Sequence, residues 1–276
     1  MKTSITAFLL AGCLALDVGI CGELTVPKNL QQGDLVLAVA TPGSLVTVGE
    51  KNVRVDKDGH FVFGLGRDHP QNLKIRASHL DGTTSVKTYP VVQREYGEQH
   101  IEGLPKALVK PSETFLVRIK IERKLVLQAR LNDTPINFFR SGIIWPVKGK
   151  ITGVYGTGRI LNGEARAPHY GIDIAAESGT EVVSAADGTI QLAADLLLSG
   201  NTVIIDHGHG ISSTYLHMKE ISVSSAQFVR RGELIGYVGS TGRSTGAHLD
   251  WRINWFHKRI DPQRALAIFG LKEEQN

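Results

Sequence analysis

The sequence predicts a mainly β protein with a small N-terminal β-sandwich-like domain, a helical linker and a C-terminal antiparallel β-sheet domain. Two observations support this fold class. The 276 residues include 30 glycines and only 7% aromatic residues, a composition that favours turns and short strands over a helical bundle. Short runs of apolar residues also recur between Gly-containing turns along most of the chain, as in proteins built from many strands.

Residues 1–22 resemble an export signal. Lys2 precedes the apolar run "ITAFLLAGCLAL", and the small residues of "VGICGE" follow, which is the order of a secretory signal peptide. We therefore expect cleavage near Gly22 and a location in the periplasm or cell envelope. The alternative is a lipid anchor at Cys13, because "LAGC" resembles a lipoprotein processing box. No segment approaches the ~20 consecutive apolar residues of a membrane span.

The cysteines and the net charge narrow the chemistry. Cys13 and Cys21 are the only cysteines, and both lie in the predicted signal. The mature protein is then expected to have no disulfide and no thiolate ligand, so any metal site must use histidine or carboxylate side chains. The net charge of +4 is small, and no basic cluster with interleaved aromatic residues indicates nucleic-acid binding.

The first two predicted segments after the signal differ in pattern. Residues 23–92 contain alternating apolar runs such as "DLVLAVATPGSLVTVG", broken by turn signals at Pro42-Gly43 and Asp58-Gly59, and predict the N-terminal β-domain. Residues 93–140 predict a linker. Within it, "PSETF" at Pro111 has the pattern of a helix start, and apolar residues then follow at roughly helical spacing.

Residues 141–270 predict the C-terminal sheet domain, and residues 271–276 a short tail. The runs "TEVVSAADGTIQLA", "GNTVIIDHGHGISSTYLHM" and "GELIGYVGSTG" are apolar β segments separated by Gly turns. We expect His207 and His209, in the Gly-rich "DHGHG", to be solvated turn residues. Tyr215 has two interpretations: it faces the same site as His217, or it packs in the sheet.

The stretch "PHYGIDIAA" contains the first candidate site residues. His169 and Asp173 are four residues apart, but Pro168 and Gly171 argue against a helix that would bring them together. In a straight strand their Cα atoms would be ~13 Å apart, too far to share one ion. Gly171 permits a bend that returns His169 towards Asp173. Taken alone, the stretch predicts only a hydrogen-bonded polar pair.

Two further stretches suggest a metal centre. "STYLHM" contributes His217, and "GAHLDWRI" contributes His248 and Asp250 on one face of a predicted strand. Catalytic zinc sites use three protein ligands and keep a further position for water. His169, Asp173 and one residue of "HLD" would complete such a set, and the remaining histidines would then be available to transfer protons.

These stretches, together with "GSTGRSTGAHLDWRI", resemble the zinc-dependent peptidoglycan endopeptidases of the lysostaphin/LytM family over about residues 144–265. The resemblance implies a LytM-type peptidase domain, a Zn²⁺ cofactor and hydrolysis of peptide crosslinks in peptidoglycan. It places zinc ligands at His169 and Asp173 and catalytic histidines at His217 and His248. The third ligand position is Asp250, where the family has the second histidine of a His-x-His motif.

The departure at Asp250 leaves alternatives open. Aspartate is an accepted zinc ligand, but two carboxylates would make the centre less positive, so we expect weaker acidification of its water. The main alternative is a non-catalytic wall-binding protein that regulates or activates another peptidoglycan hydrolase. A biotinyl or lipoyl carrier is disfavoured, since Lys219 follows Met218 but has no second flanking methionine. For an enzyme, the D-alanyl–diaminopimelate bond is favoured over a glycine bridge.

Overall fold

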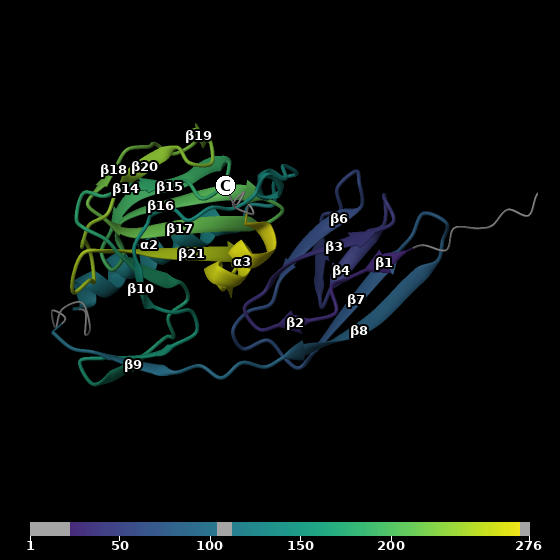
Figure 1. The fold of residues 1–276 in the computed structure, drawn as a ribbon, viewed down its shortest axis with the longest axis horizontal. Coiled ribbons are helices and arrows are strands. Elements are labelled where there is room, and N and C mark those ends of the chain that lie inside the picture. The colour runs from purple at the N-terminus through teal and green to yellow at the C-terminus, as the bar shows by residue number, and fades with distance from the viewer. Residues whose placement is uncertain (1–22, 104–111, 271–276) are drawn as a thin grey trace, which may run out of the picture.

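The computed structural model describes residues 23–103 and 112–270. The predicted signal at 1–22, including Cys13, and the predicted tail at 271–276 lie outside the described residues. Strands make up most of the regular structure (Figure 1), which confirms the mainly β prediction. No helix in the described part of the chain combines the length and apolarity needed to cross a membrane.

The N-terminal part contains two sheets that contribute to one buried core. Alternation predicted from the sequence is seen most clearly in β7, where Leu73, Ile75 and Ala77 are buried and the residues between them are exposed. Phe61 and Phe63 of β6 are fully buried. The strand orders are β1-β3-β6 (Leu24–Thr25, Leu35–Ala40, His60–Gly64) and β2-β8-β7-β4-β5 (Leu30–Gln31, Thr84–Val92, Asn72–Ser78, Leu45–Val48, Lys51–Val53).

The connecting segment contains a strand and a helix. Helix α2 (Glu113–Arg130) begins where the sequence indicates, with the Ser112 side chain accepting a hydrogen bond from the Phe115 amide as N-cap. Strand β9 (Glu98–Ile101) was not predicted. It pairs in parallel with β11 (Gly158–Leu161), which in turn pairs with β12 (Glu164–Arg166). Its polar sequence shows no apolar alternation that could have identified it.

The C-terminal part is built on an eight-stranded antiparallel sheet, as the sequence predicts. Its order is β10-β13-β21-β17-β16-β15-β19, with β22 paired to β21. The strands are Lys150–Gly153, Ile172–Ala175, His248–Trp255, Ile211–Met218, Gly200–Gly208, Gly188–Leu196, Phe228–Val229 and Lys258–Ile260. A smaller sheet, β14-β20-β18, comprises Glu181–Val183, Leu234–Tyr237 and Glu220–Ile221. The 3₁₀-helix η1 (Phe138–Ser141) precedes these sheets, and helix α3 (Pro262–Phe269) follows them.

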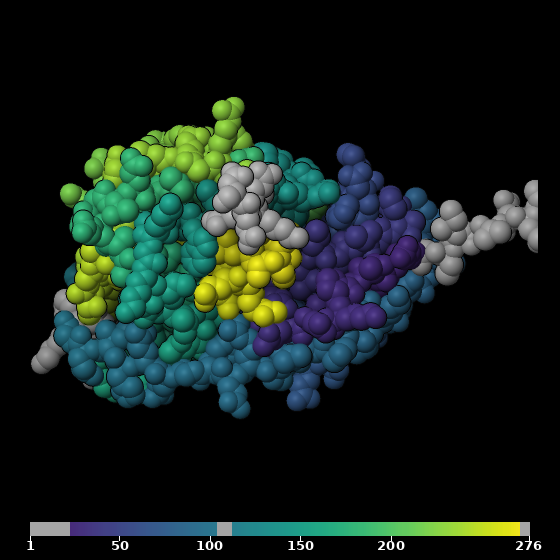
Figure 2. Space-filling view, viewed as in Figure 1, coloured from purple at the N-terminus to yellow at the C-terminus, as the bar shows by residue number. Residues whose placement is uncertain are grey.

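The two parts of the chain contact each other through α3. Figure 2 shows the purple N-terminal segment against the yellow C-terminal helix. Arg264 of α3 forms an ion pair with buried Asp34. Asp261, the N-cap of α3, pairs at 2.7 Å with Arg94 on the segment that follows β8. These pairs join the N-terminal sheets to the sheet that carries the candidate site.

Candidate functional site

Strand register brings the candidate carboxylates together. In the antiparallel pairing of β13 with β21, Asp173 lies directly opposite Asp250. On the other side of β21, Leu216 of β17 pairs with Asp250, so His217 follows at the end of the neighbouring strand. Directly opposed residues on one sheet face have closely spaced side chains. The central strands of the sheet therefore bring together residues from three distant parts of the sequence.

The bend at Gly171 returns His169 to this point. Gly171 lies so close to β21 that a Cβ there would be 2.8 Å from Oδ1 of Asp250 and 2.6 Å from the Trp251 carbonyl oxygen. Only glycine permits this approach without a shift. Nε2 of His169 consequently lies 3.1 Å from Oδ1 of Asp173 and 3.5 Å from Oδ1 of Asp250.

The three donor atoms have the spacing of a tetrahedral metal site. Ligands at zinc bond lengths of about 2.0–2.1 Å lie about 3.3 Å apart around a tetrahedral ion. His169 is 1% exposed, and its Nε2 lies within ion-pair distance of both carboxylates. Even so, neither ring nitrogen of His169 nor Oδ1 of Asp173 makes a hydrogen bond of good geometry in the described part of the chain. Burial alone would lower the pKa of His169, but Asp250 and Asp173 raise it overall. The pocket thus favours a positive charge, and its residues fit a zinc ion.

Two arginines balance the carboxylates. Arg252 holds Asp250 in a bidentate pair, with Nε 2.9 Å from Oδ1 and Nη2 2.5 Å from Oδ2. Arg159 donates to Oδ2 of Asp173 at 2.6 Å and leaves Oδ1 directed at the centre. Burial raises the pKa of Asp250, but the guanidinium of Arg252 outweighs it and holds that pKa well below its usual range. The sequence led us to expect a less positive metal centre because it has two carboxylates. That expectation did not include the positive charges of Arg159 and Arg252, which offset them.

The two remaining histidines lie beside the donor set. Nδ1 of His217 is 2.7 Å from the Thr241 carbonyl oxygen, and Nδ1 of His248 is 2.8 Å from that of Gly246. A carbonyl can only accept, so each Nδ1 carries the proton and each Nε2 of the neutral ring is an acceptor. The rings are 5.0 Å apart, and Nε2 of His248 is 3.8 Å from Oδ1 of Asp173.

The protonation of His217 should affect stability. Burial lowers its pKa to about 4, below the ~6.5 of an unfolded chain. Between these values the unfolded state binds more protons, so the free energy of unfolding should fall as the pH drops from about 6.5 to 4, by up to about 3 kcal/mol. Urea titrations of EDTA-treated wild type and His217→Gln at pH 7, 5.5 and 4.5 measure this. The wild type should lose more stability than the variant; parallel pH profiles would contradict the assignment.

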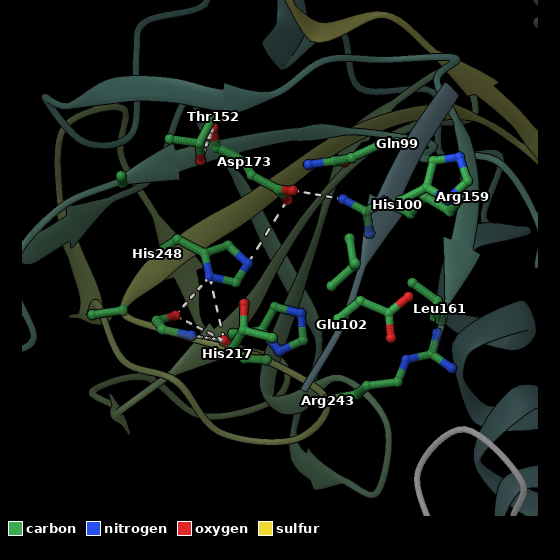
Figure 3. Close-up of a pocket in the computed structure, with 16 residues that line it drawn as sticks. Gln99, His100, Glu102, Thr152, Arg159, Leu161, Asp173, His217, Arg243 and His248 are labelled. Atoms are coloured by element: carbon green, nitrogen blue, oxygen red, sulfur yellow. Dashed lines mark hydrogen bonds and ion pairs between the residues drawn. The ribbon is translucent and has the colours of Figure 1, made fainter. Parts of the chain in front are cut away.

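A groove of about 440 Å³ is lined by Asp173, His217 and His248. Figure 3 shows the residues that line it. Asp173, His217 and His248 lie on one side of it. Across from them are Gln99 and His100 of β9 and the following Glu102, a wall that comes from the linker and that the sequence did not predict. Arg243 and Ser244 also line it.

Some neighbouring residues depart from expectation. His207 and His209 are not solvated, being only 3% and 5% exposed. His207 is fixed between the Asp187 carbonyl oxygen and the Ser213 hydroxyl, which places it in the core of the sheet. Tyr215 packs: it is fully buried opposite Trp251, and its hydroxyl accepts a hydrogen bond from the Ala185 amide. His217 has a φ of 63°, so the regular strand alternation that would place it with Tyr215 ends there.

Part of the chain is similar to known proteins. Residues 167–262 match the model of peptidase family M23. The chain is 41% identical over 87 residues to the peptidoglycan DD-endopeptidase ShyA of Vibrio cholerae, covering 32% of this chain and 20% of the relative. It is 33% identical over 135 residues to the murein hydrolase activator NlpD of Escherichia coli, covering 49% and 32% respectively. The chain therefore spans about a fifth to a third of these relatives.

A solved structure extends the likeness to the whole fold. A crystal structure from Pseudomonas aeruginosa, described as a peptidase M23, superposes with a TM-score of 0.67 over 87% of this chain and 96% of that chain, at 24% identity. The N-terminal sheets are therefore part of a fold seen before with this domain. The family match covers all five candidate site residues, which lie between 169 and 250. Residues 167–262 thus form a peptidase family M23 domain of the LytM/lysostaphin type.

Proposed function

We propose that the protein is an exported zinc-dependent endopeptidase that hydrolyses peptide crosslinks of peptidoglycan in the cell envelope. The observation that carries this proposal is the convergence of three metal-ligand atoms, from His169, Asp173 and Asp250, beside a groove that Asp173 and two histidines line. The M23 domain supports it. So does the likeness to a relative named as a peptidoglycan DD-endopeptidase, which favours the D-alanyl–diaminopimelate bond.

The residues divide the chemistry among them. His169, Asp173 and Asp250 would hold zinc, which supplies polarisation of a peptide carbonyl and acidification of a water molecule. His217 is neutral at neutral pH, because burial lowers its pKa to about 4, and its free Nε2 can accept the proton of the attacking water. His248 is partly exposed at the groove, where its Nε2 can accept a proton and, once protonated, donate a hydrogen bond to the developing oxyanion. The two histidines could also act with these roles reversed.

Digestion of purified peptidoglycan tests the reaction. The mature protein, loaded with zinc, should release soluble muropeptides whose new amino groups identify the cleaved bond by mass spectrometry. A His217→Ala, His248→Ala double variant should still bind zinc but lose about 10³-fold in rate, since each proton-transfer group contributes roughly 10²–10⁴-fold. His257→Ala, an exposed histidine outside the groove, is the matched control.

A second function has its own supporting observation. Arg252 donates to both oxygens of Asp250. An aspartate held in this way can stabilise the fold without binding a metal. A non-catalytic wall-binding regulator of another hydrolase is compatible with this contact, and one relative is named as a murein hydrolase activator. Failure of the zinc-loaded protein to cleave peptidoglycan, combined with an increased rate of an added amidase, would favour the regulator and reject the peptidase.

A further inference from the structure

A second cavity lies between α2 and the strand-connecting loop that contains Leu198. It has a volume of about 330 Å³, and half of its lining residues are apolar residues of the helix, the end of β15 and the loop. Three arginines line it as well: Arg123 and Arg130 on α2 and Arg259 on β22. The cavity shares no lining residue with the groove of the candidate active site. It is therefore a separate site on the C-terminal part of the chain.

Arg130 is a buried cation that forms no direct ion pair with the described residues. Its side chain belongs to a residue that is only 9% exposed, and its Nε has no hydrogen-bond partner in the part of the chain that the structure describes. Burying an unpaired charge costs several kcal/mol. Burial, followed by repulsion from Arg259 and Arg252, lowers the pKa of Arg130 well below its usual range. A bound anion would stabilise a cation in this position.

The neighbouring groups do not supply that anion. Arg259 donates to the neutral amide oxygen of Asn254 at 2.6 Å, and burial, followed by repulsion from Arg252, lowers its pKa to about 9. Glu122 lines the cavity, but its carboxylate already accepts hydrogen bonds from Arg118 and from the Leu197 amide.

Asp250 lies close enough to influence Arg130, but both of its oxygens are held by Arg252. The described charged groups that act on Arg130 are two cations, Arg252 and Arg259, and one anion, Asp250. The three arginines are therefore balanced by a single carboxylate. The excess positive charge faces a cavity large enough for a small molecule.

We propose that this cavity binds an anion, with a phosphate or carboxylate group held by Arg130 and Arg259. Arg123 and the Ser199 hydroxyl also line the cavity and would add hydrogen-bond donors. The apolar walls, formed by residues such as Ile119 and Leu198, suit a ligand whose charged group carries an apolar portion. Such a ligand would join the C-terminal end of α2 to the sheet and remove the repulsion between the arginines.

Thermal unfolding of the full mature protein tests this site without peptidoglycan or metal. The apo protein is melted in sodium chloride and, at equal ionic strength, in phosphate, acetate or hexanoate. A ligand that binds only the folded state stabilises it. We therefore expect either a higher Tm in phosphate than in chloride, or a higher Tm in hexanoate than in acetate and chloride. A gain with phosphate identifies a phosphate ligand, and a gain with hexanoate over acetate identifies a carboxylate with an apolar tail.

Substitutions locate the effect. Arg130→Gln and Arg259→Gln should each lower the affinity for the anion by at least about tenfold. Lys124→Gln removes a charge from an exposed position of the same helix and should leave that affinity unchanged. Arg130→Gln should melt no lower than wild type in chloride, because it removes an uncompensated buried charge. Equal Tm values in all four salts, or a gain that persists in both arginine variants, would overturn the proposal. Because no activity is measured, this outcome is independent of the peptidase assay.

Discussion

Replacement of His169 by alanine should abolish zinc binding and reduce peptidoglycan hydrolysis by at least about 10³-fold, with little loss of folding. The imidazole is the only nitrogen ligand of the donor set, and a bound metal contributes several kcal/mol to stabilisation of a reacting carbonyl. The backbone of His169 is hydrogen-bonded to Thr157 and Gly156, which the substitution leaves in place. Its ring makes no hydrogen bond of good geometry within the described chain, and the carboxylates beside it remain paired with Arg159 and Arg252. The variant therefore loses a ligand without breaking the ion pairs that hold the site.

The measurement separates binding from activity. Equilibrium dialysis followed by elemental analysis should give about one zinc per chain for wild type and much less than one for the variant. His209→Ala is a suitable control, because it removes a similarly buried histidine that lies outside the site. A variant that retains full zinc occupancy would contradict the assignment of His169, and a wild type that binds none would contradict the metal site altogether.

The sequence predicted the residues of the site better than their surroundings. His169, Asp173 and Asp250 stand in short local patterns, and Gly171 signals the bend that gathers them. Strand spacing also places Asp250 on the opposite face from Trp251, as the structure shows. These features depend on neighbours within a few residues, and such short-range relations are directly visible in a sequence.

The features that the sequence did not reveal depend on distant pairing. Arg159 reaches Asp173 only because β11 and β13 are brought together in the fold, and β9 becomes a groove wall only by pairing with β11. Arg252 is a different case. It is two residues from Asp250 on the same strand face, so the i, i+2 pattern that exposed the pair of His248 and Asp250 could also have identified this ion pair.

The pairing of Asp250 with Arg252 implies that restoring the family's histidine should damage this protein. Asp250→His would leave the Arg252 guanidinium without its carboxylate, next to Arg130 and Arg259. Breaking one partner of a buried ion pair costs about 3–5 kcal/mol, because the other charge remains buried. For a protein of this size, that corresponds to a fall in Tm of roughly 10 °C. Urea unfolding of EDTA-treated proteins measures the effect without a contribution from metal.

A double-mutant cycle isolates the interaction. Arg252→Gln alone should also be destabilising, because it leaves the buried Asp250 carboxylate without its bidentate partner. The double variant Asp250→His, Arg252→Gln should recover about 2 kcal/mol or more relative to the sum of the single effects, since it removes both charges together. Additive losses would show that the pair contributes little. A double variant that regains stability and also binds zinc would show that Asp250 and Arg252 together take the place of a neutral ligand. The aspartate brings an extra negative charge to the metal centre, and the arginine cancels it.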